Sequence, residues 1–272
     1  MTSSIPPQPA TEATPRSAKP LTVRRYKLTI AYDGTLFHGW QKQHPPGGEP
    51  LRTVQGVVEQ AIQELLGQKI HLVGASRTDA GVHAMGQVAQ FDAASPIPLE
   101  RMAMAINARL PPDVEVRHVE LAPPKFDCIN DAVSKQYRYR IWHSEHRPLG
   151  LRNLVWHCWT PLDLGRMNDA AQRLVGMHDF AGLAAAGHNR RSTVRTIHHC
   201  AVERSTEPQV HIVVQGDGFL YNMVRILAGT LVEVGRGLFE PERVDQILAT
   251  GDRRLAGPTL PPQGLCLEWI KY

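Results

Sequence analysis

Cysteine is scarce in this sequence, and long apolar runs are absent from it. The 272 residues hold four cysteines, far apart and without a C-x-x-C pair, which argues against a disulfide framework or a zinc ribbon and favours reduced thiols. No run approaches the ~20 apolar residues that a membrane-spanning helix needs. We therefore expect a cytoplasmic protein that does not enter a membrane.

The motifs of several common chemistries are also missing. The sequence has no G-x-x-x-x-G-K-[ST] phosphate loop, no H-E-x-x-H zinc helix, no G-x-S-x-G nucleophile elbow and no zinc-deaminase signature. The segment "GDGF" (216–219) lacks the third glycine of a dinucleotide turn. The two histidines of "HSEH" (143–146) would point to opposite faces of a strand end. These absences favour chemistry by carboxylate, arginine and aromatic groups, with no metal and no nucleotide cofactor.

Positive charge is only slightly in excess, and a formal net charge of +4 does not identify a partner. The cations cluster in three segments, "TVRRYK" (22–27), "SKQYRYR" (134–140) and "GHNRRSTVR" (187–195). Tyrosines stand among the cations of the first two, a mixture that suits phosphate contacts and base stacking in RNA binding. Solvated strand and loop faces are the alternative interpretation.

Composition and pattern divide the chain into a tail and two halves. Residues 1–20 are rich in proline, serine and threonine, and we expect them to form a disordered tail. Residues 21–124 and 125–272 each mix β-rich runs with amphipathic helices, and the short connections favour mainly antiparallel strands. The pattern therefore predicts two similar α+β units.

Hydrophobic periodicity predicts the positions of the helices. Apolar residues from 54 to 66 recur at i, i+3 and i+4, and Gly67 supplies a stop. Asp163 is a suitable N-cap for a helix that ends at Gly176, and a long apolar helix is expected over about 219–234. The remaining expected elements are helices at 98–109 and 241–250 and strands at 24–32, 69–75, 86–93, 114–122, 135–142, 196–205, 209–217 and 265–272.

Two segments carry candidate chemistry. In "ASRTDAGVHA" (75–84), Asp79 fits both a capping or turn pattern and a reactive carboxylate, so a functional role needs partners from elsewhere in the chain. In "GFLYNMVRILAGTLVEVG" (218–235), Arg225 stands in a helix that is apolar nearly all round, where an unpaired cation is costly. Arg225 either extends to the surface or meets an anion, and Asp79 is the best candidate by residue type.

Nine blocks in order resemble the tRNA pseudouridine synthase A family from about Tyr26 to Tyr272. Each block is weak alone, and their order over some 245 positions makes the resemblance specific. The blocks are "AYDGTLFHGWQKQ" (31–43), "TVQGVVEQAI" (53–62), "SRTDAGVHAMGQV" (76–88), "INARLPPDVEV" (106–116), "SKQYRYRIW" (134–142), "HDFAGLAAAG" (178–187), "STVRTIHH" (192–199), "GFLYNMVRILAGTLVEVGRG" (218–237) and "GLCLEWIKY" (264–272).

The resemblance implies an isomerase that converts uridine to pseudouridine at nucleotides 38, 39 and 40 of tRNA, in the anticodon stem and loop. It implies base flipping, no cofactor, tRNA as the partner and a homodimeric protein. It also implies an α+β fold in which two similar ferredoxin-like or RRM-like halves form one continuous, mostly antiparallel sheet flanked by helices, with a basic cleft between them.

The resemblance assigns roles to five residues. Asp79 corresponds to the catalytic nucleophile, Tyr137 to a tyrosine beside the target base and Arg225 to the arginine that pairs with the aspartate. Arg77 would assist in extracting the base, and Leu265 would belong to the substrate-binding residues. We expect the Arg225 guanidinium to hold the pKa of Asp79 at or below its usual ~3.9.

Two departures from the family pattern and two rival functions complete the expectations. Ser76 stands where members usually have glycine, and we expect little effect from the added hydroxyl. Asp127 and Ile129 replace a usual histidine and arginine, which removes a cation that would contact the RNA backbone. The rivals are a non-catalytic RNA-binding module and a glycosidase-like hydrolase with Asp79 and Asp92 as its two carboxylates, which would have to lie ~5–5.5 Å apart in a retaining enzyme.

Overall fold

The first half of the chain builds three long strands and two helices in ferredoxin-like order. The structure is a computed structural model that describes residues 21–185 and 192–272. The elements of this half are β1 (Val23–Tyr32), α1 (Val54–Leu66), β2 (Val73–Gly74), β3 (His83–Ala94), α2 (Leu99–Asn107) and β4 (Val114–Ala122). β1 pairs antiparallel with β3 and β4, and β2 pairs antiparallel with β3. The spatial order β4-β1-β3-β2 is that of a β-α-β-β-α-β unit.

The second half repeats this plan with additions. Its elements are β5 (Ser134–His143), β6 (Trp156–Cys158), α3 (Leu164–Gln172), β7 (Gly176–Asp179), β8 (Val194–Arg204), β9 (Gln209–Gly216), α4 (Met223–Gly235), α5 (Arg243–Thr250) and β10 (Leu265–Lys271). If the short β6, the edge strand β7 and α5 are set aside, the order is again β-α-β-β-α-β. The spatial order β10-β5-β9-β8 then matches β4-β1-β3-β2 strand for strand.

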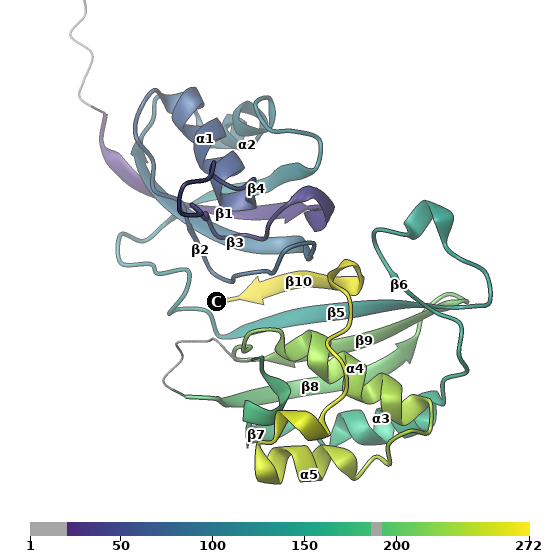
Figure 1. Cartoon of the computed structure of the whole chain (residues 1–272). Coiled ribbons are helices and arrows are strands. Elements are labelled where there is room, and N and C mark those ends of the chain that lie inside the picture. Colours follow the sequence, from purple (N-terminus) through teal and green to yellow (C-terminus); the bar gives the residue numbers. More distant parts are fainter. Residues whose placement is uncertain (1–20, 186–191) are drawn as a thin grey trace, which may run out of the picture.

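One sheet runs through both halves because β10 pairs with β3 (Figure 1). This ladder is parallel and short, with Cys266 opposite His83 and Leu267 opposite Ala84. β2 covers β3 only at Ala89 and Gln90, so it leaves the beginning of β3 free for β10. The only other parallel pair among the described strands is β5·β6. The expected α+β fold with one continuous, mostly antiparallel sheet is confirmed.

Three predicted elements are shorter than expected, and each has a local cause. The strand expected over 69–75 is reduced to β2, because the backbone N–H and C=O of Leu72 bond to the side chains of Glu59 and Gln55 on α1 instead of to a strand. The helix expected to reach Gly176 ends at Gln172, and Gly176, with φ of 120°, opens β7. The helix expected from 219 begins at Met223, because Asn222 has a left-handed backbone.

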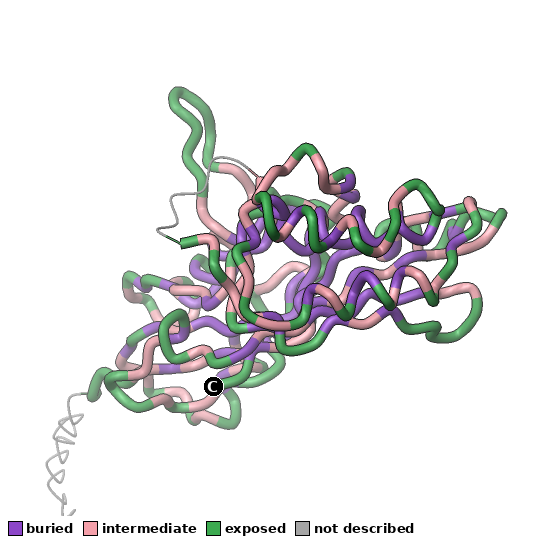
Figure 2. The backbone as a smooth tube through the Cα atoms, turned by 90° about the horizontal axis from the view of Figure 1, so that it is seen from below, coloured by how far each residue is buried: buried purple, intermediate pink, exposed green. Residues whose placement is uncertain are grey.

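Buried residues follow the strands and the inward sides of the helices (Figure 2). On β5 the predicted alternation is confirmed, since Tyr137, Tyr139 and Ile141 are buried while Arg138 and Arg140 are partly exposed.

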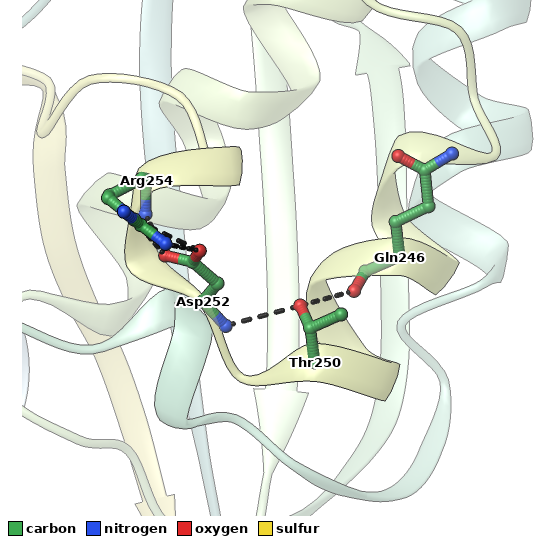
Figure 3. Close-up of polar contacts among 4 residues, drawn as sticks. All are labelled: Gln246, Thr250, Asp252 and Arg254. Atoms are coloured by element: carbon green, nitrogen blue, oxygen red, sulfur yellow. Dashed lines mark hydrogen bonds and ion pairs between the residues drawn. The ribbon is translucent and has the colours of Figure 1, made fainter.

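At the end of α5, Thr250 Oγ1 donates to the Gln246 carbonyl and accepts from Asp252 N–H, and Asp252 pairs with Arg254 (Figure 3).

Some expectations fall outside what the structure describes. The expected disordered tail, residues 1–20, lies wholly outside the described residues, as does the part of the basic segment at 187–191. No helix in the described part of the chain is both long and apolar enough to cross a membrane. The four cysteines are free and buried.

Candidate active site

Asp79 lies on a loop between β2 and β3, at the join between the two half-sheets. We call residues 75–82 the aspartate loop. Its entry is fixed by Gln87 of β3, a fully buried side chain whose amide accepts from Ser76 N–H and donates to the Ser76 carbonyl at 2.5 Å. From the second half, Lys135 of β5 donates to the Ala75 carbonyl at 2.8 Å. Both halves therefore hold the same loop.

The segment after β1 supports the aspartate loop from its other side. Trp40 N–H donates to the Thr78 carbonyl at 3.0 Å, and the Thr78 hydroxyl meets the Tyr32 hydroxyl at 2.7 Å. Gly39 has φ of +88°, and a Cβ there would lie 2.6 Å from the Thr78 carbonyl oxygen, so only glycine fits this approach. The roles of Tyr32, Gly39 and Gln87 were not predicted, and a glycine at position 39 is the one hint of this close approach that the sequence contains.

Arg225 of α4 reaches Asp79, as the sequence suggested. Its Nη1 lies 3.4 Å from Asp79 Oδ2, and the two side chains are 15% and 26% exposed. The same Nη1 donates to Asn222 Oδ1 at 2.8 Å, and Nε donates to the Leu260 carbonyl at 2.7 Å. The guanidinium is thus anchored by two short bonds within its own half and meets the carboxylate through a longer one. Asp79 Oδ1 accepts no hydrogen bond from the described residues.

The expected pKa of Asp79 is wrong in direction. Burial raises the pKa of this carboxyl above its usual value, and the charge and hydrogen bond of Arg225 only partly offset that effect. The geometry gives the reason. A single contact of 3.4 Å, from a guanidinium whose donors also serve two other acceptors, attracts the carboxylate less than a bidentate pair would.

Tyr137 of β5 lies beside the aspartate loop. Its hydroxyl is 3.0 Å from the Ser76 hydroxyl, and its ring meets Phe219 edge to face at 5.1 Å between centroids. Burial raises the pKa of Tyr137 to about 12, and the charge of Asp79 acts in the same direction. The phenol is therefore neutral near pH 7. Ser76, expected to matter little, supplies the one hydrogen bond that this hydroxyl makes to the described residues.

The other expected site residues differ in accessibility. Arg77 is exposed and makes no hydrogen bond or ion pair with the described residues, so its guanidinium is available to a ligand. Leu265 begins β10 opposite Tyr139 and is only 5% exposed, which leaves it little surface for a substrate. Asp127 accepts from the N–H groups of Ile129 and Asn130 and so closes a turn, while the Ile129 side chain is half exposed.

The alternative pair of carboxylates does not form. Asp92 is bound by Arg25 through two bonds of 2.8 and 2.7 Å. It lies on β3, nine residues beyond His83, at about 30 Å along the strand at ~3.3 Å per residue. A retaining hydrolase that uses Asp79 and Asp92 is therefore excluded. In the described ranges no three His, Cys, Asp or Glu side chains are grouped to hold a metal ion.

Comparison with known proteins identifies the family to which this chain is similar. A family model described as tRNA pseudouridine synthase matches residues 28–131 and 170–272. The chain is 42% identical to tRNA pseudouridine synthase A of Acetivibrio thermocellus and 45% identical to that of Geobacter sulfurreducens, and both matches cover 92% of this chain and 100% of the relative. A solved Cbf5–Nop10–Gar1 complex shares 11% identity over 76% of this chain and 54% of that chain, with a TM-score of 0.30, too low to add to the argument. On the first two findings, this chain belongs to the tRNA pseudouridine synthase A family.

Proposed function

We propose that this protein is an isomerase that converts uridine to pseudouridine in tRNA, with Asp79 as its nucleophile. The observation that carries the proposal is the meeting of Asp79 and Arg225. Asp79 and Arg225 are 146 positions apart in the sequence, one on a loop of the first half and the other on a helix of the second. The fold brings their carboxylate and guanidinium together at a partly exposed point. A chain that merely bound RNA would gain nothing from placing a carboxylate beside a polyanion.

The reaction breaks the bond between N1 of uracil and C1′ of ribose, turns the base and joins C5 to C1′. Nothing is oxidised or hydrolysed, so acid–base and nucleophilic groups suffice. Asp79 must be ionised either to add to the base or to act at the ribose. Arg225 on Oδ2 favours the charged form, and no described residue donates to Oδ1, so we propose that this oxygen reacts.

The residues around the carboxylate fit the steps before and after bond cleavage. A target uridine must leave its stack, at a cost of a few kcal/mol that pocket contacts offset. The Arg77 guanidinium, two residues before Asp79, is exposed and has no partner in the described ranges, which suits a phosphate or the space that the base vacates. Tyr137 is only 5% exposed, so the base would contact it through the little ring surface that is open, and its neutral hydroxyl can exchange a proton through Ser76.

The finer assignments belong to the same proposal. We place the substrate positions at nucleotides 38, 39 and 40 of the anticodon stem and loop, and we propose a homodimer acting in the cytoplasm. Residues 21–124 supply the aspartate loop and residues 125–272 supply Tyr137 and Arg225, so neither half alone would be active. Leu265 would contribute through packing beneath the base, with Tyr139 opposite it.

The test is incubation with unmodified tRNA transcripts, followed by chemical mapping of pseudouridine. We expect modification by the wild type at one or more of the three positions, and none by Asp79→Asn, with tRNA affinity changed by less than about 1.4 kcal/mol, a factor of ten. Asp169→Asn, at an exposed carboxylate on α3, is the matched control and should leave turnover unchanged. Release of free uracil would indicate hydrolysis, binding without modification would indicate an RNA-binding module, and residual turnover above a few per cent in Asp79→Asn would refute the nucleophile.

A further inference from the structure

Asn222 has an unusual backbone at the start of α4. Its φ of 58° and ψ of 5° place it in the left-handed region, where it stands alone among the non-glycine residues that the structure describes. Such backbone is strained for a residue with a Cβ, although asparagine tolerates it better than most. Asn222 occupies the N-cap position of α4, yet its side chain makes no capping bond to the helix. The backbone of Asn222 starts the helix, since its carbonyl accepts from Ile226 N–H, and its side chain is left for another partner.

The Asn222 side chain is bonded to Arg225 instead. Oδ1 of Asn222 accepts from Arg225 Nη1 at 2.8 Å, and this nitrogen is the one that faces Asp79 Oδ2 at 3.4 Å. On the other edge of the guanidinium, Nε donates to the Leu260 carbonyl at 2.7 Å, and Leu260 N–H returns a bond to the Arg225 carbonyl. Two acceptors of the second half thus compete with Asp79 for the same cation.

We propose that Asn222 is a positioning residue that holds the Arg225 guanidinium in a loose contact with Asp79 and prevents a tight ion pair. A carboxylate in a short bidentate pair with arginine has its lone pairs engaged and is a poorer nucleophile. With Nη1 shared, Asp79 keeps its counter-charge while one oxygen stays free for the substrate. This inference rests on the proposed function of Asp79.

Few other charges face this cluster. From β5, Tyr137 and Tyr139 approach Asp79 and Arg225, and burial keeps both phenols neutral by raising their pKa values. From the aspartate loop itself, Arg77 is exposed to solvent. Among the described residues, no other charged group shifts the pKa of Asp79, which burial raises and Arg225 lowers. A change in the pH dependence of turnover on the acid side therefore reports on the Asp79–Arg225 distance.

Two substitutions at Asn222 should move the acid limb of turnover in opposite directions. Asn222→Gly keeps the left-handed backbone without strain and removes the acceptor, so Nη1 closes on Asp79. We expect the acid limb to shift down by about half a unit and turnover at neutral pH to fall several-fold. Asn222→Asp keeps an acceptor but adds a second carboxylate to the same guanidinium, so the acid limb should shift up by about one to three units.

The measurement is kcat/KM on tRNA transcripts from pH 4.5 to 8, with melting temperature measured at each pH. Asn153→Gly, at an exposed asparagine outside the site, is the matched control and should leave the acid limb unchanged. A purely structural role would lower melting temperature without moving the limb, and shifts in the same direction for both variants, or none, would overturn the positioning role. If the wild type forms no pseudouridine, the proposed function fails. If the wild type is active but the Asn222 variants do not shift the acid limb as expected, only the positioning role fails.

Discussion

Replacing Arg225 by Gln removes the positive charge that opposes the desolvation of Asp79 and leaves the burial in place. At 3.4 Å, two unit charges interact by about 1 kcal/mol in bulk water and about 5 kcal/mol at an effective dielectric constant near 20. The partly exposed pair lies between these limits, which corresponds to roughly one to three pKa units. Because the pKa of Asp79 is already raised, the variant should bring it closer to neutrality.

Two measurements follow from this shift. The acid limb of pseudouridine formation should move upward by roughly one to three units in Arg225→Gln. The stability difference from wild type should also depend on pH. A carboxyl whose folded pKa is raised destabilises the fold by an amount that grows as pH rises from the unfolded value of ~3.9 to the folded pKa; the penalty is complete above the folded pKa and absent below ~3.9. The deficit in melting temperature should therefore be largest near pH 8 and shrink towards pH 4.

A second arginine provides the matched control. Arg254 pairs with Asp252 at 2.6 Å beyond the end of α5, and its side chain is 89% exposed (Figure 3). Arg254→Gln makes the same chemical change at an exposed pair, and it should alter neither the acid limb nor its slope. An unchanged acid limb in a folded Arg225→Gln protein would mean that Arg225 does not set the charge state of Asp79, and the electrostatic argument would fail.

Three further substitutions test Tyr137 and its hydrogen-bond partner Ser76. Tyr137→Phe keeps the ring against Phe219 and removes the hydroxyl, so we expect slower turnover with tRNA affinity within about tenfold of wild type. Tyr137→Leu removes the ring as well and should weaken both tRNA affinity and turnover. Normal turnover in both variants would show that Tyr137 is not part of the site. Ser76→Ala leaves the buried phenol without its partner, so we expect a loss of about 1 kcal/mol in unfolding free energy and slower turnover with KM unchanged, and no added effect in a Tyr137→Phe background. Additive effects in that double variant would show that Ser76 acts independently of the hydroxyl.

Periodic features of the fold could be predicted because they depend on neighbours in sequence. The apolar spacing from 54 to 66 and the left-handed Gly67 give α1 its observed bounds. Asp163 caps α3 through Arg166 N–H, as its residue type suggested. The strand expected over 114–122 is β4 without change. In each case a local preference and the tertiary structure agree.

Long-range pairing could not be predicted in this way. Nothing in the period of either segment indicates that His83 lies opposite Cys266, because a parallel ladder of two residues leaves no pattern of its own. The length of β2 was overestimated for a related reason. Leu72 and its neighbours alternate like a strand, but side chains of α1 take the backbone bonds that a strand would need. Competition for hydrogen bonds is decided by the assembled fold.

In the candidate site, too, one feature could be predicted from the sequence and another could not. A costly arginine in an apolar helix requires an anion, and that requirement pointed from Arg225 to Asp79 across 146 residues. Residue types alone do not fix the strength of the contact, since it depends on how many acceptors share the guanidinium, and Asn222 and Leu260 were invisible as competitors. Burial raises the pKa of Asp79, the loose contact with Arg225 offsets this only in part, and the raised pKa is useful to the proposed reaction. A more basic carboxylate is a better nucleophile provided that it stays ionised, and a loosely held arginine meets both conditions where a tight pair would meet only the second.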